Sequence, residues 1–275
     1  MRALVAVALL AATPARADHF LLDVLTYNIH GLPAWIALDD PPARIPQILE
    51  KAKDFGIVLF QEDFSYQPAV DSARQPHRWR GSPPALALIG VGSGVTTLSW
   101  FPTVGEPEAE PYGVCNGWLG AANDCLGNKG WLRVRLQLPG EHTLDVWNTH
   151  LDAGRDALDR EARRAQLDAL AAAIASQSDG RAVLLGGDFN SEWDDQDDRA
   201  LLEGFAKRAG LALVAQTPPD GWQSHLDYVF VRNGAGVCVA AMDGGKDPAF
   251  ADGGGKPLSD HPAIRVGLAI DGCGD

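Results

Sequence analysis

Ser259-Asp260-His261-Pro262 runs directly into an alternation of apolar residues, Ala263, Ile264, Val266, Leu268 and Ile270. A period of two is typical of a β-strand that buries one face. The stretch therefore predicts an Asp-His pair at the lip of a strand, on the rim of a sheet.

Five other short segments place metal-binding or proton-carrying side chains next to apolar runs. They are Tyr27-Asn28-Ile29-His30-Gly31, Phe60-Gln61-Glu62-Asp63, Asn148–Gly154, Gly186-Gly187-Asp188-Phe189-Asn190 and His225–Val231. Each one alone is compatible with a solvated strand end. Together with the first stretch, they predict one active site assembled from many strand termini.

The rest of the chain alternates between strand-like and helix-like patterns. Strands are expected at Leu21–Ile29, Gly56–Phe60, Trp131–Leu138, Leu144–Thr149, Ala182–Gly187, Asp227–Val231 and Val237–Ala241. Helices are expected around Ile45–Phe55, at Arg155–Ser176 with Leu158, Ala162, Ala165 and Ala169 on its buried face, and at Arg199–Ala209. Stretches 102–113 and 243–257 are expected to be long loops. Because strands outnumber helices and interleave irregularly, this α/β chain is best accommodated by two face-to-face sheets flanked by helices.

Residues 1–17 have the pattern of a secretory signal peptide. Arg2 precedes the apolar run Ala3–Ala12, and Ala15-Arg16-Ala17 fits a cleavage site. The alternative is a membrane anchor, but the run is about half the length that a spanning helix needs. Residues 18–275 are therefore expected to form one exported domain, secreted or periplasmic, without a transmembrane segment and monomeric.

The net charge and the cysteines further limit the class of protein to which this chain can belong. A formal charge of −13 disfavours nonspecific binding to nucleic acid, although bound divalent cations reverse the sign locally. Four cysteines in an exported chain predict two disulfides, and three pairings are open. We favour the nearest-neighbour pairing, Cys115–Cys125 with Cys238–Cys273. The alternative use of the cysteines, a zinc site, is disfavoured because the sequence lacks the usual Cys-x-x-Cys spacing.

Glu62 is a candidate ligand for a hard cation. It follows the buried run Ile57–Phe60, and a carboxylate at a sheet rim suits Mg²⁺, which also takes phosphate oxygens. Asn28 ends the first strand and is expected beside it. The alternative for Glu62 is a solvated acidic residue.

The remaining candidates suit phosphoester hydrolysis. Asp188 and Asn190 point to the same side, where a carboxylate accepts a proton and an amide donates to a phosphate oxygen; the alternative is an Asx-turn. Asp227 is available to orient His261 as a base. His150 is expected to contact the phosphate or protonate the leaving oxygen, with support from Asn148. The serine-hydrolase elbow Gly-x-Ser-x-Gly and the zinc motif His-Glu-x-x-His are both missing from the sequence.

From Tyr27-Asn28 to Asp260-His261, the chain resembles the endonuclease/exonuclease/phosphatase superfamily. The resemblance implies a four-layer α/β sandwich, with Mg²⁺ (or another divalent cation such as Mn²⁺) on Glu62 and with Asn28 and Asp260 close by. It also implies that Asp188 and the His261–Asp227 pair activate water, while His150 and Asn190 hold or protonate the phosphate.

Within this superfamily, stretches 124–130 and 148–154 are similar to the sphingomyelinase-like branch, and Lys129-Gly130 also resembles inositol-phosphatase relatives. Abasic-site nucleases typically carry a tyrosine in place of His150, which counts against membership of that branch. The aromatic hairpin with which some bacterial sphingomyelinases engage membranes is not obvious. Trp118-Leu119 and Trp35-Ile36 either form a smaller apolar tip or pack into the body.

The expected function is therefore that of an exported Mg²⁺-dependent phosphodiesterase, sphingomyelinase-like, that cleaves a phospholipid head group at a membrane surface. The first alternative is a secreted nuclease of the same fold. The further alternatives, which the sequence favours less, are an inositol-phosphate phosphatase and a non-catalytic binding module.

Overall fold

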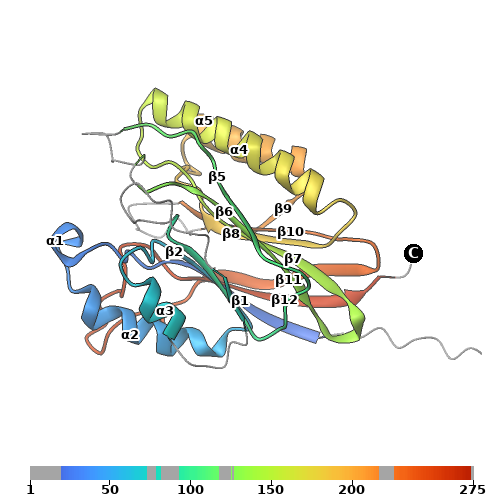
Figure 1. Ribbon diagram of the computed structural model, residues 1–275, viewed down its shortest axis with the longest axis horizontal. Coiled ribbons are helices and arrows are strands. Elements are labelled where there is room, and N and C mark those ends of the chain that lie inside the picture. Colours follow the sequence, from blue (N-terminus) through green and yellow to red (C-terminus); the bar gives the residue numbers. More distant parts are fainter. Residues whose placement is uncertain are drawn as a thin grey trace, which may run out of the picture.

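Two six-stranded sheets face each other between two layers of helices in the computed structural model (Figure 1). The structure describes residues 20–72, 79–81, 93–117, 125, 127–216 and 226–273. Helices α2 and α3 cover the outer face of the first sheet, and α4 and α5 cover the outer face of the second. The predicted four-layer α/β sandwich is confirmed.

The first sheet has the strand order β11-β12-β1-β2-β4-β3. Its strands are β1 (Phe20–Asn28), β2 (Ile57–Gln61), β3 (Trp79–Gly81), β4 (Val95–Ser99), β11 (Val237–Lys246) and β12 (Ile264–Gly272). β1 lies parallel to β2 and antiparallel to β12. The ends of β1 and β2 therefore share one edge with the start of β12, and Asn28, Glu62 and His261 meet there.

The second sheet has the strand order β5-β6-β7-β8-β10-β9. Its strands are β5 (Glu108–Pro111), β6 (Gly130–Gln137), β7 (Thr143–His150), β8 (Val183–Asp188), β9 (Ala212–Gln216) and β10 (Asp227–Arg232). The register pairs Asp188 with His150 on one side and with Asp227 on the other. Hydrogen bonding between strands thus brings three predicted site residues into one row.

Three of the described helices begin at a side-chain N-cap, which is Asp40 for α2, Asp156 for α4 and Asp195 for α5. The helices are α1 (Ala34–Ala37), α2 (Pro41–Lys51), α3 (Gln67–Ser72), α4 (Ala157–Gln177) and α5 (Gln196–Ala209), with 3₁₀ turns at Ala52–Asp54 and Pro139–Glu141. Asp156 forms a capping box with Asp159 at the start of α4, and Asp195 caps α5. Gly210 ends α5 in the left-handed conformation.

The buried face of α4 differs from the predicted one. Leu158 is 60% exposed and Ala169 is exposed, whereas Leu167, Leu170 and Ile174 are buried against the second sheet. The larger side chains bury more apolar area than alanine does, so they determine which face of the helix packs inward.

The two predicted long loops contain strand residues. β5 lies within 102–113, and β11 continues to Lys246 within 243–257. The polar sequence of β5 carries little strand signal. It forms an edge strand because β6 supplies its hydrogen-bond partners.

Apolar packing fills all three spaces between the four layers. The largest cluster lies between the two sheets and includes Val24, Leu59, Val146 and Val229. A second cluster lies under α4 and α5, and a third lies under α2. The site residues sit at the end of the sandwich, on strands fixed by this packing.

The two disulfides confirm the nearest-neighbour pairing. Cys115 is bonded to Cys125, and Cys238 is bonded to Cys273. The second bond ties the start of β11 to the end of β12. Nowhere in the described ranges is a helix both long enough and apolar enough to cross a bilayer.

Gly187 is the residue at which the sheet beside the site is least tolerant of a side chain. Its φ is +154°, and a Cβ there would lie 2.1 Å from the Thr149 carbonyl oxygen on β7. We expect Gly187→Ala to lower the free energy of unfolding by about 3 kcal/mol, because β7 and β8 must separate. Urea denaturation would measure the change. Gly253→Ala, where no atom lies within 4 Å, is the matched control and is expected to be near neutral. Equal stability of the two variants would contradict this prediction.

Candidate active site

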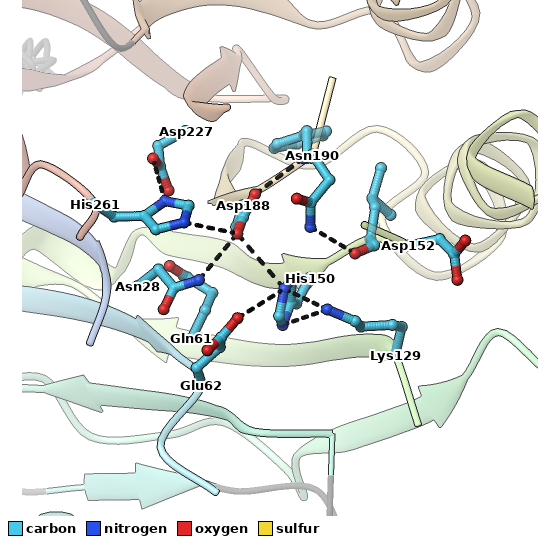
Figure 2. Close-up of polar contacts among 12 residues, drawn as sticks. Asn28, Gln61, Glu62, Lys129, His150, Asp152, Asp188, Asn190, Asp227 and His261 are labelled. Atoms are coloured by element: carbon cyan, nitrogen blue, oxygen red, sulfur yellow. Dashed lines mark hydrogen bonds and ion pairs between the residues drawn. The ribbon is translucent and has the colours of Figure 1, made fainter. Parts of the chain in front are cut away.

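Asp188 lies at the centre of the site (Figure 2). It ends β8, its side chain is 1% exposed, and its Oδ2 accepts a hydrogen bond from Asn28 Nδ2 at 3.0 Å. The same oxygen lies 3.5 Å from His150 Nε2 and 3.8 Å from His261 Nε2. One carboxylate oxygen is thus shared by an amide and two imidazoles from both sheets.

The other Asp188 oxygen has a local structural role. Oδ1 accepts a hydrogen bond from the Asn190 backbone N–H at 2.9 Å, which is the geometry of an Asx-turn. The Asx-turn alternative and the functional interpretation are therefore compatible, because each oxygen of Asp188 serves one of them. Burial raises the pKa of Asp188. The positive charge of His261, the next largest effect, lowers it, but the net shift is upward.

His261 is held by a buried carboxylate. Its Nδ1–H donates to Asp227 Oδ2 at 2.8 Å, and Asp227 is fully buried. Nε2 therefore faces Asp188. Burial lowers the pKa of His261, but Asp227 and Asp188 outweigh burial and hold it well above its usual value. This is the geometry of an imidazole fixed in one orientation and stabilised as imidazolium.

His150 is buried next to an ammonium group that the sequence analysis did not single out as a site residue. The pairing of Gly130 with His150 brings Lys129 alongside, and Lys129 Nζ donates to His150 Nε2 at 2.6 Å. Burial, then the positive charges of Lys129 and His261, keep the pKa of His150 well below its usual value. Only the resemblance of Lys129-Gly130 to phosphatase relatives signalled this lysine.

Glu62 is held in an unusual backbone conformation. Its φ is +57°, a strained region for a residue with a side chain. Its carbonyl oxygen accepts a hydrogen bond from Gly31 N–H at 2.7 Å, and a Cβ on Gly31 would lie only 2.4 Å from that oxygen. The close approach of Gly31 therefore aims the Glu62 side chain at the site, where Oε1 lies 3.7 Å from His150 Nε2.

Asp63 fixes the other side of this turn. It is 1% exposed, Thr96 Oγ1 donates to its Oδ2, and its N–H donates to the Gly94 carbonyl. Burial raises its pKa to about 6, although the hydrogen bond from Thr96 opposes the shift. Asp63 therefore anchors the segment from inside rather than facing the site.

The donor set suits a divalent cation. Ligand atoms of Glu62, His150 and Asp188 all lie within 4.8 Å of one another. The Glu62 and Asp188 side chains are 18% and 1% exposed, and the His150 imidazole, whose pKa is held well below its usual value, lies within 3.7 Å of both. A hard cation that prefers carboxylate oxygens fits the Glu62 and Asp188 side of this group.

Asn28 and Asp260, the other two predicted metal ligands, make contacts to neighbouring residues in this structure. Asn28 Oδ1 accepts from the His30 backbone N–H at 3.0 Å, so its NH₂ group and not its oxygen faces Asp188. The Asp260 side chain is 59% exposed and lies 3.7 Å from His30 Nδ1. Asp260 and His261 lie in the bend before β12, which leaves the Asp260 side chain exposed while His261 contacts Asp227.

Asn190 and Asn148 have supporting contacts in this structure. Asn190 Nδ2 donates to the Leu151 carbonyl at 2.8 Å, which leaves the second N–H of that amide for another acceptor. Asn148 Nδ2 donates to the carbonyls of Phe60 and Thr96, and its Oδ1 accepts from Gln61. Asn148 therefore ties the two sheets together, and the predicted hydrogen bond to His150 is not the contact it makes.

Arg44 and Ser259 are further residues that sequence reasoning missed. Arg44 donates to the carbonyls of Ile29, His30 and Leu258, and Ser259 Oγ donates to the Asn28 carbonyl at 2.8 Å. Both join the first strand end to the loop before His261. His225, Trp118 and Leu119 lie outside the described residues.

The arrangement is of the kind found in hydrolases, with a buried carboxylate and a fixed imidazole facing the Glu62 carboxylate across the ends of two sheets. Family comparison agrees with this class. The endonuclease/exonuclease/phosphatase family matches residues 25–261, so the chain belongs to this family of phosphoester hydrolases.

Two mycobacterial sphingomyelinases are similar in sequence to this chain. A sphingomyelinase of Mycobacterium bovis is 33% identical over 266 residues, which covers 89% of this chain and 52% of that protein. A sphingomyelinase of Mycobacterium tuberculosis has the same values. The chain thus spans about half the length of the curated relatives it matches.

Solved structures share the fold. Sphingomyelinase C from Streptomyces griseocarneus superposes with a TM-score of 0.68 at 20% identity, covering 90% of this chain and 99% of that one. A variant of beta toxin from Staphylococcus aureus with bound magnesium ions also gives 0.68, at 16% identity and 89% and 98% coverage.

Lys129 is expected to contribute strongly to turnover, because it is the buried positive charge nearest to His150. Lys129→Met keeps the length of the side chain and removes the charge, and we expect kcat/KM to fall about 10²-fold. Steady-state kinetics on a phosphodiester would measure the loss. Lys207→Met, exposed at the end of α5, is the matched control. A Lys129→Met enzyme within threefold of the wild type would refute the contribution.

Proposed function

We propose that the chain is an exported, Mg²⁺-dependent phosphodiesterase that hydrolyses the head-group ester of a phospholipid, as a sphingomyelinase does. The observation that supports it most is the convergence of His150 and His261 on one buried oxygen of Asp188, with the Glu62 carboxylate next to His150. The similarity to mycobacterial sphingomyelinases favours the lipid substrate.

Glu62 and Asp188 are the residues that would hold the cation, with Asn28 and Asp260 as the further candidates. When bound, a cation of this kind neutralises charge on the phosphate. Asn28 in turn positions Asp188 through its amide.

In the proposed reaction, water attacks phosphorus and the bond from phosphorus to the leaving oxygen breaks. His261, oriented by Asp227, takes the water proton at Nε2, and Asp188, whose Oδ2 lies 3.8 Å from that nitrogen, stabilises the imidazolium that forms. Asn190 binds a phosphate oxygen. His150 protonates the leaving alkoxide and is reprotonated by the Lys129 ammonium that donates to its Nε2. General acid–base help of this kind contributes about 10²–10⁴ in rate. From sphingomyelin the products are phosphocholine and ceramide.

Export is part of the proposal. Residues 1–17 have the signal-peptide pattern, and two disulfides are typical of proteins that work outside the reducing cytosol. We further propose that residues 18–275 act as one monomeric domain.

The test compares substrates. The purified protein is incubated with sphingomyelin in detergent, with plasmid DNA and with an inositol phosphate, each with Mg²⁺ or with EDTA. We expect release of phosphocholine with Mg²⁺ and none with EDTA. DNA cleavage without lipid turnover would replace the proposal by a secreted nuclease, and phosphate release from the inositol phosphate alone would replace it by a phosphatase. Binding without turnover of any substrate would favour a non-catalytic module.

A further inference from the structure

An exposed apolar tip lies just beyond the end of β1. Its side chains are Trp35, Ile36 and Leu38, which are 79%, 44% and 89% exposed. We call these three residues the apolar tip. Within the described residues, no other run of four positions holds more than one exposed large apolar side chain. Such a cluster marks an interaction surface more strongly than scattered exposed residues do.

The tip is at the same end of the molecule as the site. Figure 1 shows α1 projecting at the end where β1 finishes, next to the start of α2. Residues 29–33 alone separate the tip helix from Asn28, whose amide contacts Asp188. A surface that meets the tip therefore lies at the same end of the molecule as the site.

Contacts behind the tip hold it in place relative to the site. Asp39, which follows Leu38, accepts a hydrogen bond from Arg44 Nε at 2.8 Å and lies 3.8 Å from His30 Nδ1. His30 in turn donates its N–H to Asn28. The tip is therefore connected by successive contacts to the residue that positions Asp188.

A cavity of about 540 Å³ lies between the tip helix, α2 and the loop 252–260 that precedes His261. Its lining includes Ala37 of α1, His30, Arg44, Lys256 and Asp260. The cavity lies beside the tip and extends as far as Asp260, the residue before His261.

The negative charge around the tip determines which kind of membrane surface the tip can bind. Asp39 and Asp40 stand directly behind it, and the chain carries a net charge of −13. An anionic membrane would repel this protein, whereas a zwitterionic surface exposes cationic groups outward and offers an apolar layer beneath. A tryptophan flanked by aliphatic residues is suited to such an interface, because its ring is apolar and its N–H is polar.

We propose that Trp35, Ile36 and Leu38 insert into the surface of a zwitterionic phospholipid bilayer and so place the cavity and Asp188 over the head groups. The choice of a lipid partner rests on the proposed function. The inserted residues supply the attachment by apolar burial, and the acidic residues behind them exclude anionic membranes.

Binding is measured by co-sedimentation with vesicles of phosphatidylcholine and sphingomyelin in EDTA, where no turnover occurs. Trp35→Ala and Leu38→Ser are each expected to lower the partition coefficient about tenfold, since each removes a large apolar side chain from the inserted set. Leu21→Ser is the matched control. Leu21 is 69% exposed at the opposite end of β1, and its replacement is expected to leave partition unchanged. Circular dichroism confirms that each variant is folded.

Fluorescence adds a direct readout of insertion. Vesicles with brominated acyl chains are expected to quench part of the wild-type tryptophan emission, and Trp35→Phe should remove a measurable share of that quenching. Unchanged quenching would overturn the proposal, as would equal partition of wild type and tip variants. Partition that rises with phosphatidylserine and falls with salt would overturn it as well, because attachment would then be electrostatic.

The two proposals fail in different ways. If the wild type cleaves DNA but not lipid while vesicle binding still depends on the tip, the proposed substrate is wrong and the tip stands. If the wild type releases phosphocholine from sphingomyelin in detergent while tip variants bind vesicles normally, the tip is wrong and the proposed function stands.

Discussion

Replacing His261 with alanine is expected to lower kcat about 10²–10⁴-fold while leaving the fold intact. His261 is the imidazole that Asp227 fixes by a 2.8 Å hydrogen bond, and its Nε2 faces Asp188. In the proposed reaction it is the group that takes the proton of the attacking water. Steady-state kinetics on the phosphodiester substrate give the loss, and circular dichroism checks the fold.

Chemical rescue separates a base from a structural residue. Added imidazole can enter the space left by His261→Ala and accept a proton, so part of the lost rate should return with imidazole concentration. Asp227→Asn, which keeps a hydrogen-bonding group but loses its charge, is expected to reduce the rate less and to show no rescue. The control is His142→Ala, at the other end of β7. His261→Ala activity close to that of the wild type would disprove the assigned role.

Removing the Glu62 carboxylate is expected to abolish most of the Mg²⁺-dependent activity. Glu62→Gln keeps the size of the side chain but takes away the negative charge that a hard cation prefers. We expect the rate at 1 mM Mg²⁺ to fall by about 10²-fold or more, since changes even outside the ligands of a metal site typically cost 10–100-fold. A titration of rate against Mg²⁺ would show the shift.

A thermal-stability measurement tests the same prediction without turnover. A cation that binds the folded state raises Tm as its concentration rises. The wild type should show this rise with Mg²⁺, and Glu62→Gln should lose it. Glu203→Gln, on the exposed face of α5, is the control and should behave as the wild type. If Glu62→Gln still gains stability from Mg²⁺ as the wild type does, Glu62 is not a ligand.

Much of the fold was predictable from local pattern. Period-two alternation located β12 and β1, and buried apolar runs located β2 and β8. Polar edge strands such as β5 were not predictable, since their hydrogen bonds come from a neighbouring strand and leave no apolar pattern. The buried face of α4 was predicted wrongly, because alanine spacing gave way to the packing of Leu167, Leu170 and Ile174.

The candidate site shows the same division. His150, Asp188, Asp227 and His261 were found in the sequence because each follows or begins an apolar strand, and strand ends meet at a sheet edge. The strained conformation of Glu62 and the approach of Lys129 to His150 depend on contacts between segments far apart in the chain.

The sequence by itself determined which residue types stand at the strand ends, since apolar period and turn residues act over a few positions. Only the tertiary structure decided which atoms meet. In the folded protein the Asp260 side chain is exposed, the Asn28 amide donates to Asp188, and the Lys129 ammonium donates to His150. The physical reason is that strand register, sheet pairing and competition for hydrogen-bond partners are settled between distant segments, and no local pattern encodes them.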